Sequence, residues 1–143
     1  MELDLTALQQ TSLLASPQVF RTAKQNVQFV ADLVGATASD VSSALERLGI
    51  DQRIASTQAS LLSAGQRRRT ALAALVVRRA QLWLLDEPHA GLDAKGRDEI
   101  DRIVKDAAAS GATIVVASHE IERAQQLATR TISLVAGQVR DSQ

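Results

Sequence analysis

The chain has 143 residues with 16 basic and 16 acidic side chains, so its formal net charge is zero. This length is typical of a single domain, and a hydrophobic content of 45% excludes a disordered chain. The chain has no cysteine, which excludes disulfides and thiolate metal sites, and its neutral charge argues against a general nucleic-acid-binding protein. The longest apolar runs, 70–77 and 82–85, are far shorter than the roughly 20 residues of a membrane-spanning helix. With Glu2 and Asp4 near the start, we also expect no signal peptide.

The first sixty residues carry a mainly helical pattern. Val27, Val30, Ala31 and Val34 fall on one face of a helix. In chain order we expect a weak strand at Glu2–Leu8, a polar connection at Gln9–Gln18, a helix from Thr22 ended by Gly35, a helix from Ser39 to Leu48 capped by Ser39 or Asp40 and ended by Gly49, and one helical turn within Asp51–Ala59.

Helices and apolar strands alternate after Leu61. The two apolar strands show no alternation with polar residues, which is typical of parallel strands covered on both faces. The alternation of element types predicts an open α/β sheet. We expect a helix from Gly65 to about Arg79, a strand at Leu82–Leu85, a helix from Lys95 to Ala109, a strand at Thr113–Ala117, a helix at Glu120–Ala128, and a β-turn-β unit of Thr131–Val135 and Gln138–Arg140 around Gly137.

Two acidic residues, Asp86 and Glu87, directly follow the first of these apolar strands. Open α/β sheets bind their ligands at the carboxyl ends of the strands. A carboxylate there can hold Mg²⁺ directly or through water, and a second carboxylate can accept a proton from an attacking water. The alternative is an acidic turn, in which either carboxylate accepts hydrogen bonds from nearby backbone N–H groups.

The start of the long helix has two interpretations. Ser63 and Gln66 have the spacing of a capping box, which is a purely structural arrangement. The three arginines at 67–69, however, oppose the helix dipole. They fit an anion site, because helix N-termini bind phosphate through free N–H groups, and Gly65 lets a phosphate approach the backbone closely.

Three further polar residues follow strands or turns. His119, with Ser118, leaves the second apolar strand and would face the same cleft as Asp86; the alternative is an ordinary strand-end histidine. Asp93 comes after a glycine-containing turn, where an aspartate is usually a helix N-cap. We assign no function to the other histidine, His89.

The helix start, the first apolar strand with its two acidic residues, the glycine-containing turn and the second apolar strand with its histidine follow one another within about sixty residues. With these segments in this order, the chain resembles the ATP-binding cassette (ABC) ATPase family. Leu62–Gln66 resembles the family's signature motif, with Ala64 in place of the commoner glycine. Leu82–Asp86 resembles its Walker B strand, and Glu87 resembles its catalytic glutamate. The resemblance covers essentially all of the chain.

The remaining motifs of the family also have counterparts. Gly91–Asp93 resembles the D-loop, and Ser118–His119 resembles the segment with the switch histidine. Thr22–Val27 resembles the opening of the helical subdomain. Gln9 resembles the glutamine of the Q-loop, and Gln10 is the alternative register.

The resemblance implies the α/β fold of a P-loop NTPase-like nucleotide-binding domain, here without its N-terminal part. The chain would hold the helical subdomain and the Walker B half of the parallel sheet. We expect the Q-loop region and a residual core strand at 1–20, the helical subdomain at 21–60, and the signature helix with the C-terminal half of the core at 61–143. Within the family, the run Leu82–Asp93 is similar to the haem-exporter ATP-binding subunits of cytochrome c biogenesis.

In such proteins two cassettes enclose two ATP molecules, each held between the Walker motifs of one subunit and the signature motif of the other. The resemblance therefore implies that Ser63, Ala64, Gly65 and Gln66 bind the γ-phosphate of ATP held by a second ABC subunit. It places Asp93 at the seam between the two subunits.

The resemblance also implies roles for the strand-end residues. Asp86 and Gln9 would organise Mg²⁺, Glu87 would orient or deprotonate the attacking water, and His119 would contact the γ-phosphate. Gln9 would link this site to a membrane permease subunit, with the cassette in the cytoplasm on the inner face of the membrane.

One family motif is absent from these 143 residues. The phosphate-cradling loop G-x-x-x-x-G-K-[ST] would stand upstream of the Q-loop, yet the first glycine is Gly35, and Lys24, Lys95 and Lys105 are followed by Gln, Gly and Asp. We expect a truncated sequence of an ATP-hydrolysing transporter subunit that alone neither binds ATP tightly nor hydrolyses it, and that is poorly soluble because an apolar sheet edge is uncovered. The alternatives are a non-enzymatic partner that lends its signature face to a complete cassette, and an ABC ATPase acting outside transport, which the neutral charge disfavours.

Overall fold

A computed structural model describes residues 20–141. The predicted strand at Glu2–Leu8 and the connection at Gln9–Gln18 lie outside these residues. In chain order the elements are α2 (Ala23–Val34), α3 (Ala38–Arg47), α4 (Gln52–Ala55), the 3-10 helix η1 (Ala59–Leu61), α5 (Ala64–Arg78), β1 (Leu82–Asp86), α6 (Ala94–Ala109), β2 (Thr113–Ala117), α7 (Ile121–Leu127), β3 (Ile132–Val135) and β4 (Gln138–Asp141). The strands β1 and β2 pair in parallel, whereas β3 and β4 form an antiparallel hairpin. The predicted α/β class is therefore confirmed.

The helix starts are set by short side chains that bond back to the backbone. At α2 the Thr22 hydroxyl accepts from the Gln25 N–H at 3.2 Å, and the helix ends at Gly35 in the left-handed region, as predicted. The predicted cap of α3, Ser39 or Asp40, is wrong. The cap is Thr37, whose hydroxyl accepts from the Asp40 N–H at 3.2 Å while the Asp40 carboxylate accepts from the Thr37 N–H at 2.9 Å. This reciprocal pair fixes the helix start one turn before Asp40.

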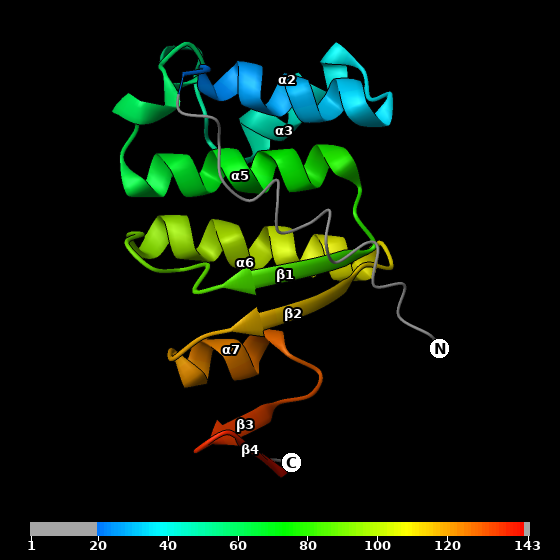
Figure 1. Cartoon of the computed structure of the whole chain (residues 1–143), viewed down its shortest axis with the longest axis vertical. Coiled ribbons are helices and arrows are strands. Elements are labelled where there is room, and N and C mark those ends of the chain that lie inside the picture. Colours follow the sequence, from blue (N-terminus) through cyan, green and yellow to red (C-terminus); the bar gives the residue numbers. More distant parts are fainter. Residues whose placement is uncertain (1–19, 142–143) are drawn as a thin grey trace.

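Helix α5 lies in the middle of the molecule, with α2 and α3 on one side and α6, β1 and β2 on the other (Figure 1). A continuous cluster of buried apolar side chains runs through these layers. It includes Val27 of α2, Leu48 after α3, Leu72 of α5, Trp83 of β1 and Ile100 of α6. The helical half and the sheet half of the described chain therefore share one core.

Only one face of the β1–β2 sheet is covered by residues 20–141. Trp83 and Leu85 are buried on the face that packs on α6, whereas Leu84 is 43% exposed and Val115 is 53% exposed. Leu84 and Val115 are partners in the register, so the exposed face is apolar across both strands. The prediction that these strands are covered on both faces is therefore wrong for the described part of the chain. A run of apolar residues cannot by itself show whether an element lies on the second face.

The hairpin predicted around Gly137 is confirmed. Ala136 and Gly137, with φ values of 50° and 76°, form its two-residue turn. Two positive φ values in succession match the right-handed twist of the flanking strands. Ile132, Leu134 and Val139 remain exposed on the hairpin.

The strand ends and several helix starts lie on one side of the molecule. In Figure 1 the arrowheads of β1 and β2 point to the same side as the first turns of α5, α6 and α7. The register pairs Asp86 with Ala117, the last residues of the two strands. Glu87 and Ser118 therefore leave the sheet side by side.

Candidate functional site at the carboxyl edge of the sheet

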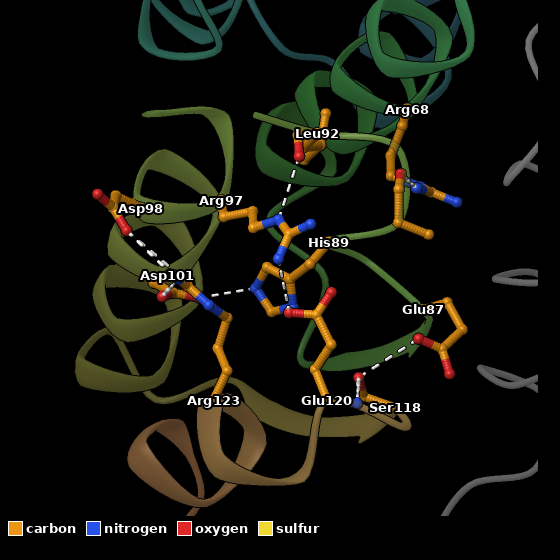
Figure 2. Close-up of polar contacts among 11 residues, drawn as sticks. Arg68, Glu87, His89, Leu92, Arg97, Asp98, Asp101, Ser118, Glu120 and Arg123 are labelled. Carbon is orange, nitrogen blue, oxygen red and sulfur yellow. Dashed lines mark hydrogen bonds and ion pairs between the residues drawn. The ribbon is translucent and has the colours of Figure 1, made fainter. Parts of the chain in front are cut away.

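The Glu87 carboxylate contacts both Ser118 and His119. Figure 2 shows the Ser118 side of this contact. The Oε1 atom of Glu87 is 2.7 Å from Nδ1 of His119 and accepts a hydrogen bond from the His119 backbone N–H at 2.9 Å. The Ser118 hydroxyl donates to Oε2 at 3.3 Å. Three groups that follow β2 thus converge on one carboxylate that follows β1.

The backbone of Glu87 explains how its side chain reaches across to β2. Its N–H donates to the Ala117 carbonyl at 2.9 Å, which continues the pairing of the strands by one step. Its φ is 46°, in the left-handed region that a residue with a side chain rarely adopts. Such a backbone costs free energy and persists only where its surroundings hold it.

The electrostatics of the site favour an ionised Glu87. Partial burial by itself would raise the pKa of Glu87. The hydrogen bonds from the ring and backbone of His119, together with the Ser118 hydroxyl, outweigh this effect and hold the pKa below its usual value of 4.5. Glu87 is therefore a carboxylate at neutral pH, with its oxygens available as hydrogen-bond acceptors.

Asp86 is exposed, and no hydrogen bond or ion pair holds its carboxylate within residues 20–141. His119, which we expected to share a cleft with Asp86, makes its contacts with Glu87. The described residues contain no group of three or more side chains suited to hold a metal. Asp86 immediately precedes Glu87 at the carboxyl end of β1, and a carboxylate there can contribute to Mg²⁺ binding, since Mg²⁺ is usually bound by one or two protein carboxylates together with phosphate oxygens and water. Gln9, the other expected metal ligand, lies outside the described residues.

The segment that resembles the signature motif is the capped start of α5. The Ser63 hydroxyl accepts from the Gln66 N–H at 3.2 Å, and the Gln66 side chain accepts from the Ser63 N–H at 2.9 Å. Ser63 and Ala64 are exposed. A Cβ atom on Gly65 would come within 3.1 Å of Leu92 Cδ2, so the absence of a side chain lets the two segments pack. The capping-box interpretation is confirmed, and it leaves the surface of Ser63 open.

Two of the three arginines after Gln66 donate hydrogen bonds to backbone carbonyls. Arg67 donates to the Leu62 carbonyl at 2.6 Å, and Arg68 donates to the Ala90 carbonyl. These bonds stabilise the loops on either side of the helix start. Arg67 and Arg68 therefore have a structural explanation, whereas the buried Nε atom of Arg69 has no hydrogen-bond partner within residues 20–141. The N–H groups of the first turn remain as the groups that an anion would meet there.

Asp93 is the N-cap of α6, where its Oδ1 atom accepts from the Gly96 N–H at 2.8 Å. The interpretation as a helix cap is thus confirmed. The residue is exposed at the surface. The capping bond engages only Oδ1 of the carboxylate, so Asp93 can cap α6 and also contact a second subunit.

Sequence reasoning missed a polar network behind Glu87. His89, to which we assigned no function, is buried, and its Nε2 atom lies 2.7 Å from Asp101 Oδ1 (Figure 2). On α6, Arg97 donates a hydrogen bond to Glu120. Asp101 of the same helix accepts one from Arg123. The spacing of four between Arg97 and Asp101 could have placed them on one helix face. No pattern in the sequence indicated that His89 is buried.

The described elements and their strand-end residues are those of a partial α/β cassette. The chain belongs to the ABC transporter family, whose model matches residues 4–90. Its fold is part of the nucleotide-binding cassette of that family. Among residues 20–141, the helices lack the combination of length and apolar character that crossing a bilayer requires.

Two relatives are named as ATP-binding proteins of transport systems. The chain is 39% identical over 95 residues to the cytochrome c biogenesis ATP-binding export protein CcmA of Rhodopseudomonas palustris (strain BisB5), covering 66% of this chain and 47% of that protein. It is 31% identical over 127 residues to the energy-coupling factor transporter ATP-binding protein EcfA2 of Mycoplasma pneumoniae (strain ATCC 29342 / M129 / Subtype 1), covering 85% of this chain and 42% of that protein. The chain thus spans less than half the length of these relatives.

A solved structure agrees with this family. The dimeric post-hydrolysis state of the ATP-binding cassette MJ0796, bound to ADP and Pi, superposes with a TM-score of 0.77 at 27% sequence identity. The superposition covers 86% of this chain and 56% of that chain.

Proposed function

We propose that this chain is part of the ATP-binding motor subunit of an ABC transporter, which couples ATP binding and hydrolysis to transport across a membrane. The observation that carries this proposal is the convergence of Ser118 and His119 on the Glu87 carboxylate, directly after Asp86, at the carboxyl edge of two parallel strands. In open α/β proteins this edge is where ligands bind.

Each residue at this edge has a chemical task in the proposal. Glu87 is ionised and accepts a proton from, or orients, the water that attacks the γ-phosphate. His119 holds Glu87 and contacts the γ-phosphate. Asp86, with Gln9 from outside the described residues, would hold Mg²⁺, and that ion neutralises charge on the phosphate oxygens when bound.

The start of α5 is proposed to serve a second ABC subunit. Ser63, Ala64, Gly65 and Gln66 would face the γ-phosphate of ATP held by that subunit, which the exposed Ser63 and Ala64 permit. The N–H groups of the first helical turn are suited to bind an anion. Asp93 would lie near the seam between the two subunits, because its loop packs on Gly65 through Leu92.

The wider setting follows from the named relatives and the resemblance. We propose that the whole subunit binds a membrane permease on the cytoplasmic face and that its transport task is export in cytochrome c biogenesis, as the name of the Rhodopseudomonas palustris relative indicates for that protein. The proposed division of the chain remains a Q-loop region at 1–20, a helical subdomain at 21–60, and the signature helix with half of the ATPase core at 61–143.

Alone, this chain is proposed to bind ATP weakly and to hydrolyse none. The given residues contain no G-x-x-x-x-G-K-[ST] loop, so nothing in them supplies the lysine and the nest of N–H groups for the β- and γ-phosphates. Steady ATPase activity of the purified chain, or nucleotide affinity in the micromolar range by fluorescence titration, would contradict this proposal.

A second candidate function has its own observation. The start of α5 is fully capped and its Ser63 is exposed, so the signature face is intact in a chain without the phosphate loop. Such a chain could act as a non-enzymatic partner that completes the ATP site of a full cassette.

Two mixtures separate these functions. In the first, the chain is combined with the amino-terminal half of a family cassette that carries the phosphate loop. In the second, it is combined with a complete cassette whose own signature serine is replaced by alanine. The motor function predicts ATPase activity in the first mixture that Glu87→Gln abolishes. The partner function predicts activity in the second mixture that Ser63→Ala abolishes and Glu87→Gln leaves intact. Inactivity in both mixtures would contradict both functions.

A further inference from the structure

A polar network on α6 ties together the two segments that carry Glu87 and His119. Arg97 donates from Nε to the Leu92 carbonyl at 3.1 Å and from a terminal nitrogen to Glu120 Oε2 at 3.1 Å. It thus joins the loop after Glu87 to the residue that follows His119. Figure 2 shows Arg97 between Leu92 and Glu120.

Asp101, one turn further along α6, makes a second link of the same kind. Its Oδ1 atom lies 2.7 Å from Nε2 of His89, and its Oδ2 atom pairs with Arg123 of α7. Because an ionised carboxylate can only accept, Nε2 of His89 is the donor. Asp98 is a weaker partner of Arg123, at 3.3 Å.

The burial of His89 and Asp101 separates their contact from ordinary surface ion pairs. The side chain of His89 is 2% exposed and that of Asp101 is 18% exposed. Exposed ion pairs contribute little to stability, whereas a buried polar group left without its partner costs free energy. Burial would lower the pKa of Arg123, but the charges of Asp101 and Asp98 raise it above its usual value.

We infer that Arg97, Asp101, His89 and Arg123 are positioning residues that hold the loop after β1 against the start of α7, so that Glu87 and His119 stay in contact. Each link joins a residue shortly after Glu87 to a residue shortly after His119. None of the four contacts the Glu87 carboxylate. The consequence for ATP hydrolysis rests on the proposed function, but the positioning itself does not.

Hydrogen exchange of backbone amides tests the positioning in the chain as it stands. The variants are Asp101→Asn and Arg123→Met. The matched control is Arg102→Met, which breaks the pair of Arg102 with Glu99 on the exposed side of the same helix. We expect exchange at the His119 amide and in α7 to accelerate at least about tenfold in the two network variants, with amides of α5 within about twofold of the parent chain. The control should leave all of these amides unchanged.

A second measurement separates positioning from general support of the fold. Nuclear Overhauser contacts between the His119 ring and the Glu87 side chain report their contact directly, and they should weaken in both network variants and not in Arg102→Met. Unchanged exchange at 118–124, acceleration spread equally over α5, or unchanged contacts between His119 and Glu87 would overturn the inference. Neither measurement uses nucleotide, so a failure here leaves the ATPase proposal standing, and a failed ATPase assay leaves this result standing.

Discussion

His119 binds one oxygen of Glu87 twice, through its backbone N–H at 2.9 Å and through its ring Nδ1 at 2.7 Å. Because the carboxylate of Glu87 can only accept, Nδ1 carries a proton in this contact. In the neutral ring the other nitrogen is then an acceptor. A histidine that serves both Glu87 and a phosphate must therefore be protonated on both nitrogens.

Replacing His119 with alanine should raise the pKa of Glu87 toward its usual value of 4.5, because the ring donor that stabilises the carboxylate is lost. A depressed pKa contributes stability above the usual value, and this contribution is lost as the pH falls through the depressed one. The variant should therefore be less stable than the parent chain above pH 4.5, and the difference should shrink as the pH falls through the depressed pKa of the parent. Urea unfolding between pH 3 and 7 measures this difference. Coincident stability profiles of the two proteins would contradict the assignment of the contact.

Ser63→Asp should separate the structural role of Ser63 from its proposed role at the phosphate. Aspartate caps helices as well as serine does, so the thermal midpoint should stay close to that of the parent chain. A negative charge at this point repels a phosphate. The variant should therefore lose the ability to complete the ATP site of a full cassette with a disabled signature motif. If Ser63→Asp supports the same ATPase activity as the parent chain, Ser63 does not face a phosphate.

Asp93→Ala should destabilise the chain by about 1 kcal/mol, since it removes the oxygen that accepts from the Gly96 N–H at 2.8 Å. Asp93→Asn retains that oxygen and should have nearly the stability of the parent. Denaturant unfolding of both variants measures the difference. Equal losses from both substitutions would mean that the charge of Asp93, and not its capping bond, stabilises α6.

Leu48→Ala should lower the stability reported by Trp83, although the two residues lie in different halves of the chain. Both belong to the same buried cluster, and Leu48 is fully buried. Truncating a buried leucine costs about 2–5 kcal/mol. Trp83 is the single tryptophan, so its fluorescence reports the sheet half without ambiguity. If the fluorescence midpoint stayed fixed while the helical signal by circular dichroism moved, the two halves would be unfolding separately.

The paired substitutions Leu84→Thr and Val115→Thr should reduce self-association. These side chains are register partners on the exposed face of the sheet, at 43% and 53% exposure. Threonine is β-branched, as strands favour, and it removes apolar surface from water. Light scattering at rising protein concentration measures the effect. The matched pair Ile132→Thr and Val139→Thr on the hairpin shows whether the effect is specific to this sheet face.

The sequence predicted those elements whose ends carry strong local signals. Gly35 ends α2 because glycine readily adopts the left-handed backbone, and the turn at Gly137 follows from the same property. The start of α3 was missed because Thr37 and Asp40 form a reciprocal pair, and single-residue cap preferences favoured Ser39 or Asp40 equally. The prediction that β1 is covered on both faces was wrong because the apolar run of a strand does not show whether another element packs on its second face.

The order of the strands along the chain was enough to predict which residues meet at the candidate site. Glu87 and His119 each follow an apolar strand, and parallel pairing then brings them to one edge. The support behind them could not be predicted. The burial of His89 depends on how α6 and α7 pack, and no local pattern encodes that packing.

The parallel register of β1 and β2 has a consequence for how this chain tolerates changes in length. Glu87 and Ser118 meet because each directly follows its strand, and the number of residues between the strands plays no part in that meeting. Extra residues at the exposed tip of Ser110 and Gly111, before β2 begins, would leave the pairing of the strands intact. A single residue added between Asp86 and Glu87 would move the carboxylate away from His119. Changes in length are therefore tolerated in the loop before β2. At the carboxyl ends of the strands, the position of every residue matters.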